Sequence, residues 1–303
     1  MSLLRPLLNT WLRLVEKPRL ARAHEPQALR RTFEAHARLF FHDPRGSRFS
    51  AGSLGGVPVK WATAPGVDAV AGPLVLHFHG GGYVFGSPRT HRAMLARLSA
   101  LAGVPACLPD YRLAPEHPFP AAVEDALAVW RAVADRPGGV IVGGDSAGGG
   151  LALALMGEIL RQGLPVPRGL YAMSPLTDMT FSGASVHENA RAEAMLPVSR
   201  VDDMAAMYLP QGGAEDPRAS PLFADFTGGP PVWLCVGDTE ILRDDTRRMA
   251  ARLRDQGVPV EVTLAHDLPH VWPIFQPLLP EAMATLRALA GWISRRPAPS
   301  DGS

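Results

Sequence analysis

A single hydroxyl group stands among glycines in the stretch GGDSAGGG, residues 143–150. Its central segment GDSAG, residues 144–148, fits the pattern G-x-S-x-G, in which a serine occupies a sharp turn between a strand and a helix. The apolar run VIV precedes the segment and the run LALALM follows it, which is the context that such a turn requires. We therefore predict that Ser146 is a nucleophile for acyl transfer.

Other uses of a glycine-rich segment do not fit these residues. A dinucleotide-binding loop needs glycine at its first, third and sixth positions, and GGDSAG has Asp145 at the third. A Walker phosphate loop needs a lysine before its serine or threonine, and this stretch contains none. A flexible linker is disfavoured because the segment joins two apolar runs directly.

Acyl transfer also needs hydrogen-bond donors for the negatively charged oxygen of the tetrahedral intermediate. One expected donor is the backbone N–H of Ala147, the residue after the nucleophile. A second glycine-rich loop, HGGG at residues 79–82, follows the apolar run PLVLHF. We expect Gly81 and Gly82 to turn their N–H groups toward the serine, because three consecutive glycines exceed what a tight β-turn requires. His79 is expected to hold this loop and not to carry a proton.

A serine nucleophile needs a base, and histidine, with a pKa near about 6.5, suits that task. Where the nucleophile lies on this kind of turn, the acid and then the histidine follow it in the chain. Asp244 and Asp245 suit the first turn of the helix expected near 242–256. The remaining candidates follow two late apolar runs: Asp238 and Glu240 in GDTEILRDD, and His266 and His270 in AHDLPHVWPIF.

The elements that must position these residues alternate along the chain. Apolar runs predict strands at residues 57–63, 73–79, 104–109, 140–143, 169–174, 232–237 and 258–264. Longer periodic stretches predict helices near 88–102, 120–134, 147–161, 242–256 and 281–294. Strands this uniformly apolar are typical of a parallel sheet covered on both faces. We predict an α/β fold with a mostly parallel sheet, whose reactive groups gather at the carboxyl ends of the strands.

Composition excludes several classes of protein. The 303 residues are 47% hydrophobic and 19% charged, with a net charge of +1, which gives no reason to expect nucleic acid as a partner. Cys107 and Cys235 lie in apolar runs and are expected to be buried free thiols, and no metal motif or cofactor motif is present. No stretch has the roughly 18 uninterrupted apolar residues that span a bilayer. We therefore expect a cytoplasmic protein without stable membrane insertion.

The first 20 residues raise the question of a signal peptide. Arg5 and Arg13 interrupt their apolar run, and no small-residue cleavage site follows, so export is disfavoured. Apolar residues recur there at helical spacing, which predicts an amphipathic helix whose apolar face packs on the rest of the protein. These residues are Leu4, Leu8, Trp11, Leu12 and Val15.

Three motifs in order, HGGG, DYRLAPEHPFPAA (residues 110–122) and GDSAGG, resemble the bacterial hormone-sensitive-lipase-like esterases of the α/β-hydrolase fold. The resemblance covers residues 40–295 approximately. It implies a serine-hydrolase triad, no cofactor, and a helical cap. The cap would comprise residues 1–48 and an insertion at 176–215 within a core of residues 49–303. Arg112 and Glu116 would then fix loops behind the site.

The same resemblance guides the choice between the remaining candidates. The family's histidine lies a few residues beyond its strand and before an apolar or aromatic stretch, which favours His270 over His266. Relatives carry an aspartate two residues before a leucine, and counting back from Leu242 gives Glu240. Glutamate departs from the usual aspartate, so Asp238 stays the alternative. A glutamate carboxylate can still accept the N–H of an imidazole.

The function expected is hydrolysis of short- to medium-chain carboxylic esters through an acyl-enzyme, with a small-molecule ester as partner and a homodimer as one option. An amidase or lactonase would use the same residues, and a non-catalytic receptor of the same fold is a further alternative. An enclosed apolar pocket is expected if the cap folds over the site. Its expected lining is Leu3, Leu7, Trp11, Phe33, Phe40, Met195, Met204, Met207 and Tyr208.

Overall fold

Eight strands form a single sheet within the residues that the computed structural model describes, 2–68, 72–276 and 278–296. The strand order is β1-β2-β4-β3-β5-β6-β7-β8, with β1 to β2 and β2 to β4 antiparallel and the other pairs parallel. The strands are β1 (Arg48–Leu54), β2 (Val57–Thr63), β3 (Leu74–Phe78), β4 (Ala106–Pro109), β5 (Val140–Asp145), β6 (Gly169–Met173), β7 (Val232–Gly237) and β8 (Val260–Ala265). Seven of them lie within two residues of their predicted bounds.

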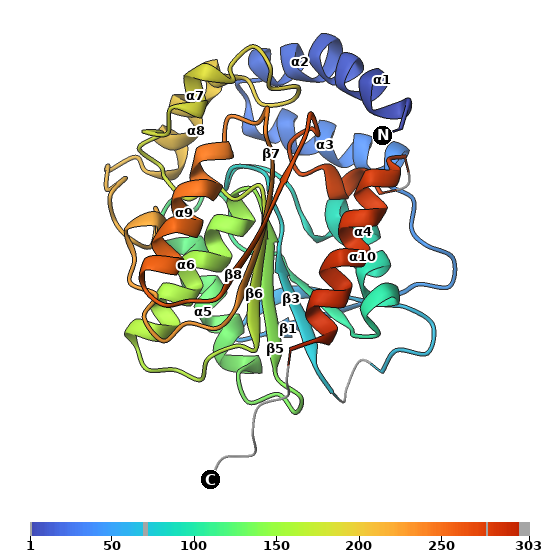
Figure 1. The fold of residues 1–303 in the computed structure, drawn as a ribbon, viewed down its shortest axis with the longest axis vertical. Helices are drawn as coiled ribbons and strands as arrows, with labels where there is room; N and C mark the ends of the chain where they lie inside the picture. The colour runs from blue at the N-terminus through green and yellow to red at the C-terminus, as the bar shows by residue number, and fades with distance from the viewer. Residues whose placement is uncertain (1, 69–71, 277, 297–303) are drawn as a thin grey trace.

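Helices cover both faces of this sheet, which confirms the predicted fold class (Figure 1). One face carries α4 (Pro88–Ala102) and α10 (Pro280–Ser294), which pack on each other. The other carries α5 (Ala121–Val133), α6 (Ala147–Arg161) and α9 (Arg243–Asp255). Two apolar cores result, one on each face, because the central strands are buried on both sides. The described part of the chain has no helix of the length and apolar character needed to cross a membrane.

The remaining helices lie across one end of the sheet, at the top of Figure 1. They are α1 (Leu4–Trp11), α2 (Lys17–Arg22), α3 (Pro26–Phe40), α7 (Ser185–Glu188) and α8 (Val201–Tyr208). A single π-helical turn, Leu12–Glu16, joins α1 to α2. Short 3₁₀ turns lie at Val198–Arg200, Pro221–Phe223 and Trp272–Phe275.

Strand β1 was not predicted from the sequence. Its residues, RFSAGSL, are mostly exposed and contain no apolar run. The strand forms because β2 offers an unpaired edge, to which residues 48–54 pair through a hairpin whose turn uses the positive φ angles of Gly55 and Gly56. An edge strand that buries little side-chain area leaves only a weak hydrophobic pattern.

The expected apolar face of the first helix is correct only in part. Leu12 is buried, whereas Leu4 and Val15 are 51% and 45% exposed. The wider π turn rotates each residue by a smaller angle than an α turn, so Val15 lies further from the face of Leu12, whereas Glu16, four residues after Leu12, stays on that face and is buried. The apolar stripe of the helix is therefore interrupted by an acid.

The contact between helix α6 and strand β3 generates a stability prediction. A methyl group at Gly148 would lie 2.1 Å from the carbonyl oxygen of Phe78. We expect Gly148→Ala to reduce the free energy of unfolding by at least about 2 kcal/mol. Urea denaturation of the purified protein would measure the change.

Gly291 is a matched control, since it is also helical but its added methyl group would meet only a side-chain nitrogen of Arg295 at 3.6 Å. Gly291→Ala should leave stability unchanged or raise it by up to about 1 kcal/mol. Equal stability of the two variants would contradict the close packing at Gly148.

Candidate active site

Ser146 lies at the sharp turn between strand β5 and helix α6, as G-x-S-x-G predicted. Its φ angle is 52°, a left-handed conformation that non-glycine residues rarely adopt. A methyl group at Gly144 would lie 2.2 Å from the carbonyl oxygen of Gly148. The backbone segments before and after Ser146 therefore approach too closely for a side chain at position 144. The turn directs the Ser146 hydroxyl into a cavity at the carboxyl end of the sheet.

A continuous chain of hydrogen bonds leads from this hydroxyl to Glu240. The Ser146 Oγ and the His270 Nε2 are 2.9 Å apart, and the His270 Nδ1 and the Glu240 Oε2 are 2.7 Å apart. His270 follows strand β8 and Glu240 follows strand β7, so neighbouring strands deliver both side chains to the same end of the sheet. Both side chains are buried, at 3% and 0% exposure.

The second oxygen of Glu240 is also held. Its Oε1 accepts hydrogen bonds from the Ser174 hydroxyl at 2.8 Å and from the Gly237 N–H at 2.6 Å. Ser174 also accepts a hydrogen bond from the N–H of Val271, the residue after the histidine. Sequence reasoning missed Ser174, although its position directly after strand β6 was a signal. These bonds fix the orientation of the carboxylate against the imidazole.

The two alternative candidates pair with each other elsewhere. The His266 Nδ1 lies 2.7 Å from the Asp238 Oδ2, and the His266 side chain is 71% exposed. Neither residue lines the cavity. Asp244 and Asp245 lie in the first turn of α9, as predicted. They also accept hydrogen bonds from the backbone N–H groups of Thr177, Asp178 and Ser185.

The glycine-rich loop lies against the serine. A methyl group at Gly80 would be 3.1 Å from the Cβ of Ser146, and Gly81 and Gly82 line the same cavity. Among the described residues, the N–H groups of Gly81, Gly82 and Ala147 donate to no other protein group. They are therefore free to bind an oxygen atom near Ser146.

His79 stays outside the cavity and supports this loop. Its ring stacks on Tyr111 with the centroids 4.4 Å apart, and its Nδ1 lies 2.9 Å from the Gly80 carbonyl oxygen. Burial lowers the pKa of His79 to about 3, so the ring is neutral at physiological pH. His79 thus holds the glycine-rich loop, as the sequence suggested.

Two buried carboxylates act on the charge of His270. Burial disfavours the imidazolium, but the hydrogen bond and charge of Glu240 outweigh this effect and raise the pKa of His270 above its ordinary 6.5. Glu193 also favours the imidazolium, and its own pKa is raised by burial and by the charge of Glu240. Glu193 accepts the N–H of Ile241 at 3.1 Å, next to Glu240, and the sequence gave no sign of it.

Asp145, adjacent to the serine, lies in a second buried network that the sequence did not reveal. Its two oxygens lie 3.0 Å from the His77 Nε2 and 3.2 Å from the His91 Nε2. The His77 Nδ1 contacts the Tyr171 hydroxyl at 2.8 Å. Burial opposes ionisation of Asp145, yet His91 and His77 hold its pKa well below the usual range. The buried carboxylate of Asp145 thus links the turn at Ser146 to strand β3 and helix α4 through the two histidines.

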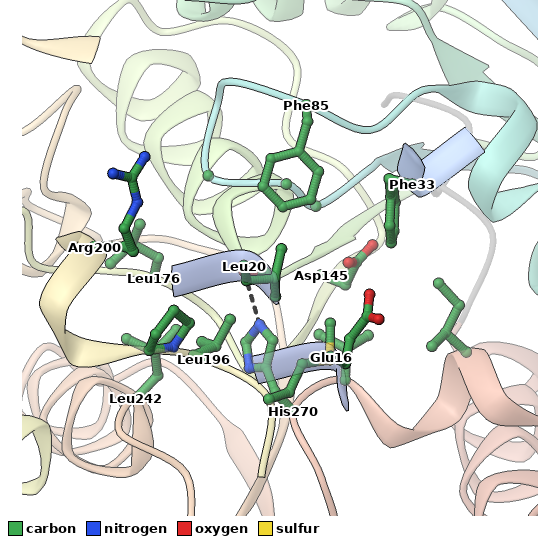
Figure 2. Close-up of a pocket in the computed structure, with 18 of the residues that line it drawn as sticks. Glu16, Leu20, Phe33, Phe85, Asp145, Leu176, Leu196, Arg200, Leu242 and His270 are labelled. Atoms are coloured by element: carbon green, nitrogen blue, oxygen red, sulfur yellow. Dashed lines mark hydrogen bonds between the residues drawn. The ribbon is translucent and has the colours of Figure 1, made fainter. Parts of the chain in front are cut away.

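The cavity extends from Ser146 to the helices above the sheet, and its wall is mostly apolar (Figure 2). Of the expected lining residues, Trp11, Phe33, Phe40, Met195 and Met204 are present. The expectation was wrong for Leu3 and Leu7, which are 88% and 68% exposed, and for Met207 and Tyr208. Tyr208 instead stacks on Tyr83 within the core, with the centroids 3.9 Å apart.

Other predicted residues lie behind the site. Arg112 pairs with Asp125 of α5, and Glu116 pairs with Arg30 of α3. Cys107 and Cys235 are free and buried, as expected. Within the described ranges, no three His, Cys, Asp or Glu residues are placed to hold a metal ion.

Comparison with known proteins agrees with this geometry. The family model described as the α/β-hydrolase fold matches residues 75–274. An acetyl-hydrolase of Streptomyces hygroscopicus is 35% identical over 244 residues, which cover 80% of this chain and 81% of that protein. The fold and the serine turn thus define an α/β hydrolase.

Solved structures narrow the class further. The esterase EstE5 superimposes with a TM-score of 0.92 at 35% identity, covering 98% of this chain and 99% of its own. An esterase described as belonging to the bacterial hormone-sensitive lipase family gives 0.90, with the same identity and coverage. The chain therefore belongs to the hormone-sensitive-lipase-like esterases of the α/β-hydrolase fold, and it is a carboxylic ester hydrolase.

The pairing of His270 with Glu240 predicts how its imidazole titrates. NMR titration of the ring should give a pKa above 6.5 in the unaltered protein. In Glu240→Gln the pKa should fall, because burial is then opposed by less negative charge. In Asp238→Asn it should stay unchanged, since that carboxylate pairs with His266. The opposite response of the two variants would identify Asp238 as the partner.

Proposed function

We propose that Ser146, His270 and Glu240 are the catalytic triad of a serine esterase that hydrolyses short- to medium-chain carboxylic esters. The observation that carries the proposal is the unbroken hydrogen-bonded chain from the Ser146 hydroxyl through His270 to Glu240. Such a chain activates an otherwise weak nucleophile and holds the imidazole in the tautomer that accepts its proton. The proposed donors for the oxyanion are the N–H groups of Gly81, Gly82 and Ala147.

The first half of the reaction forms the acyl-enzyme. The Ser146 Oγ attacks the ester carbonyl carbon while its proton passes to the His270 Nε2. The carbonyl oxygen becomes an oxyanion, which the three N–H groups bind, each such donor contributing about 3–4 kcal/mol to the barrier reduction. The bond to the alcohol oxygen then breaks, and the departing alcohol takes the proton from His270.

The second half releases the acid. Water transfers a proton to the His270 Nε2 and attacks the acyl carbon, and a second tetrahedral intermediate collapses as Ser146 regains its proton. Glu240 accepts the Nδ1–H of His270 in both halves and stabilises the imidazolium that forms in each. The charge of Glu193, close to the same pair, contributes to the same effect.

Residues 1–48 and 176–215 are proposed to form the cap over a core of residues 49–303. Both segments contribute side chains to the wall of the cavity above Ser146, among them Trp11, Phe33 and Met204. The rings of Trp11 and Phe40 pack edge to face, with their centroids 5.5 Å apart. These aromatic rings limit the length of the cavity. An apolar wall of limited length favours short to medium acyl chains.

The proposal extends to the cell compartment and to assembly. A cytoplasmic location agrees with two cysteines that remain free thiols. A homodimer stays a prediction: β8 is an outer strand of the sheet, where a second copy would find unpaired backbone groups.

The nucleophile is tested by Ser146→Ala. Removing the hydroxyl should reduce hydrolysis of p-nitrophenyl butyrate by at least about 10³-fold and abolish covalent labelling by a fluorophosphonate probe, with thermal stability preserved. Ser294→Ala, on the exposed side of α10, is the control and should keep both properties. Full turnover by Ser146→Ala would refute the triad.

The cap wall is tested by a series of p-nitrophenyl esters from C2 to C12. The ratio kcat/KM should be highest for short or medium chains and fall at least about tenfold toward C12, because the longest chains exceed the cavity. Trp11→Ala should relieve this loss selectively for C12. Leu14→Ala, an exposed change on the same segment, should not. A rate that rises steadily to C12 in the unaltered protein would argue against an enclosed acyl pocket.

A further inference from the structure

One wall of the substrate cavity carries an acid at a position where an apolar side chain is expected. Leu12, Glu16 and Leu20 follow one another at intervals of four residues, and all three line the cavity. In Figure 2 the Glu16 carboxylate points toward the side of the cavity where Asp145 and Phe33 are drawn. A charged side chain inside an apolar stripe lowers the stability of the fold. Residues that break the local pattern in this way are concentrated at functional sites.

Glu16 lies four residues after Leu12, on the same buried face of the helical segment. The π turn Leu12–Glu16 ends at this residue, and single π turns inside helices occur frequently at functional sites. Glu16 is only 6% exposed, whereas the preceding Val15, which the π turn rotates away from this face, is 45% exposed.

One carboxylate oxygen of Glu16, a residue that lines the cavity, has no hydrogen-bond partner among the described residues. Its Oε1 is paired with Arg19 at 2.6 Å. Its Oε2 is buried and accepts no hydrogen bond from any residue that the structure describes, and the His36 Nδ1 lies 3.5 Å from it. A buried carboxylate oxygen without a donor is costly, and a ligand that brings a donor would remove that cost.

The other charged groups on this wall are already engaged. Asp145 is held by His77 and His91. Arg200 pairs with Asp203, and Figure 2 shows its guanidinium turned away from His270. Arg200 also has an unpartnered nitrogen, but that atom is a donor and cannot replace the acceptor that Glu16 supplies.

From this geometry we infer that the Glu16 carboxylate is a substrate-binding subsite for esters that carry a hydroxyl group, an assignment that rests on the proposed ester hydrolysis at Ser146. A neutral donor fits better than an ammonium group, because Arg19 already balances the charge of Glu16. The hydroxyl would donate to the Glu16 Oε2, while the apolar remainder of the substrate contacts Leu12, Leu20 and Phe33.

The test uses two pairs of esters in which a hydroxyl replaces a methyl group of equal size. Ethyl 3-hydroxybutanoate and ethyl 3-methylbutanoate place the difference on the acyl side. 2-Hydroxyethyl butanoate and propyl butanoate place it on the alcohol side. The quantity measured is the kcat/KM ratio of the hydroxylated ester to its partner, because intrinsic reactivity cancels when the same ratio is compared between variants.

In Glu16→Leu this ratio should fall at least about tenfold for one of the two pairs, the loss expected for a hydrogen bond to a charged group. The responding pair identifies the side of the ester that the subsite binds. Glu25→Leu, which removes an exposed carboxylate at the start of α3, is the matched control and should leave both ratios within about twofold. If Glu16→Leu does not fold, Glu16→Gln provides the comparison, with a loss of at least about threefold because a neutral amide accepts a weaker bond.

Unchanged ratios for both pairs in the Glu16 variants would overturn the subsite, because a purely structural ion pair would affect both members of a pair alike. That outcome would leave the proposed function intact as long as the unaltered protein hydrolyses the apolar esters and Ser146→Ala does not. Absence of Ser146-dependent hydrolysis of any ester would overturn both.

Discussion

At Ser146 the chain passes from strand β5 to helix α6 with a φ angle of 52°, and backbone carbonyl groups surround the glycines on both sides of it. A methyl group at Gly150 would lie 2.0 Å from the carbonyl oxygen of Leu176, in addition to the contacts at Gly144 and Gly148. This packing fixes the serine relative to the glycine-rich loop after β3 and to the segment after β6. The glycines around Ser146 therefore allow close packing of the backbone and do not serve as a flexible linker.

Burial of ionised groups is the second constraint on the site. The two carboxylates next to Ser146 and His270 have identifiable partners: Asp145 has two histidines, and Glu240 has His270, Ser174 and a backbone N–H. Glu193 accepts backbone N–H groups of Met195 and Ile241. The negative charge gathered around one imidazole is what raises its pKa despite its burial. The site thus favours the imidazolium that acyl transfer generates.

Local sequence patterns were sufficient for the features that depend on local chemistry. Ser146 and the glycines of the loop follow from spacing, and the sheet follows from apolar runs. Choosing Glu240 over Asp238 required family resemblance, because both follow the same strand. Ser174, Glu193 and the network behind Asp145 act through contacts between distant segments, which no short pattern records. The sequence also gives no sign of the π turn that rotates Val15 outward, since the residues of this turn suit an ordinary α-helix.

The N-terminal helical segment, from α1 through the π turn to α2, is tied to the loops that carry the proposed base and its neighbours. Asn9 and Arg5 donate to backbone carbonyls of residues 267 and 266, three and four positions before His270. Lys17 donates to the carbonyls of Ala190 and Glu193. The same segment closes the top of the cavity, so swinging it outward to admit a bulky molecule would break anchors of the proton-transfer loop. A molecule too large for the cavity would therefore be disfavoured twice: it would not fit, and making room for it would displace the loop that carries His270.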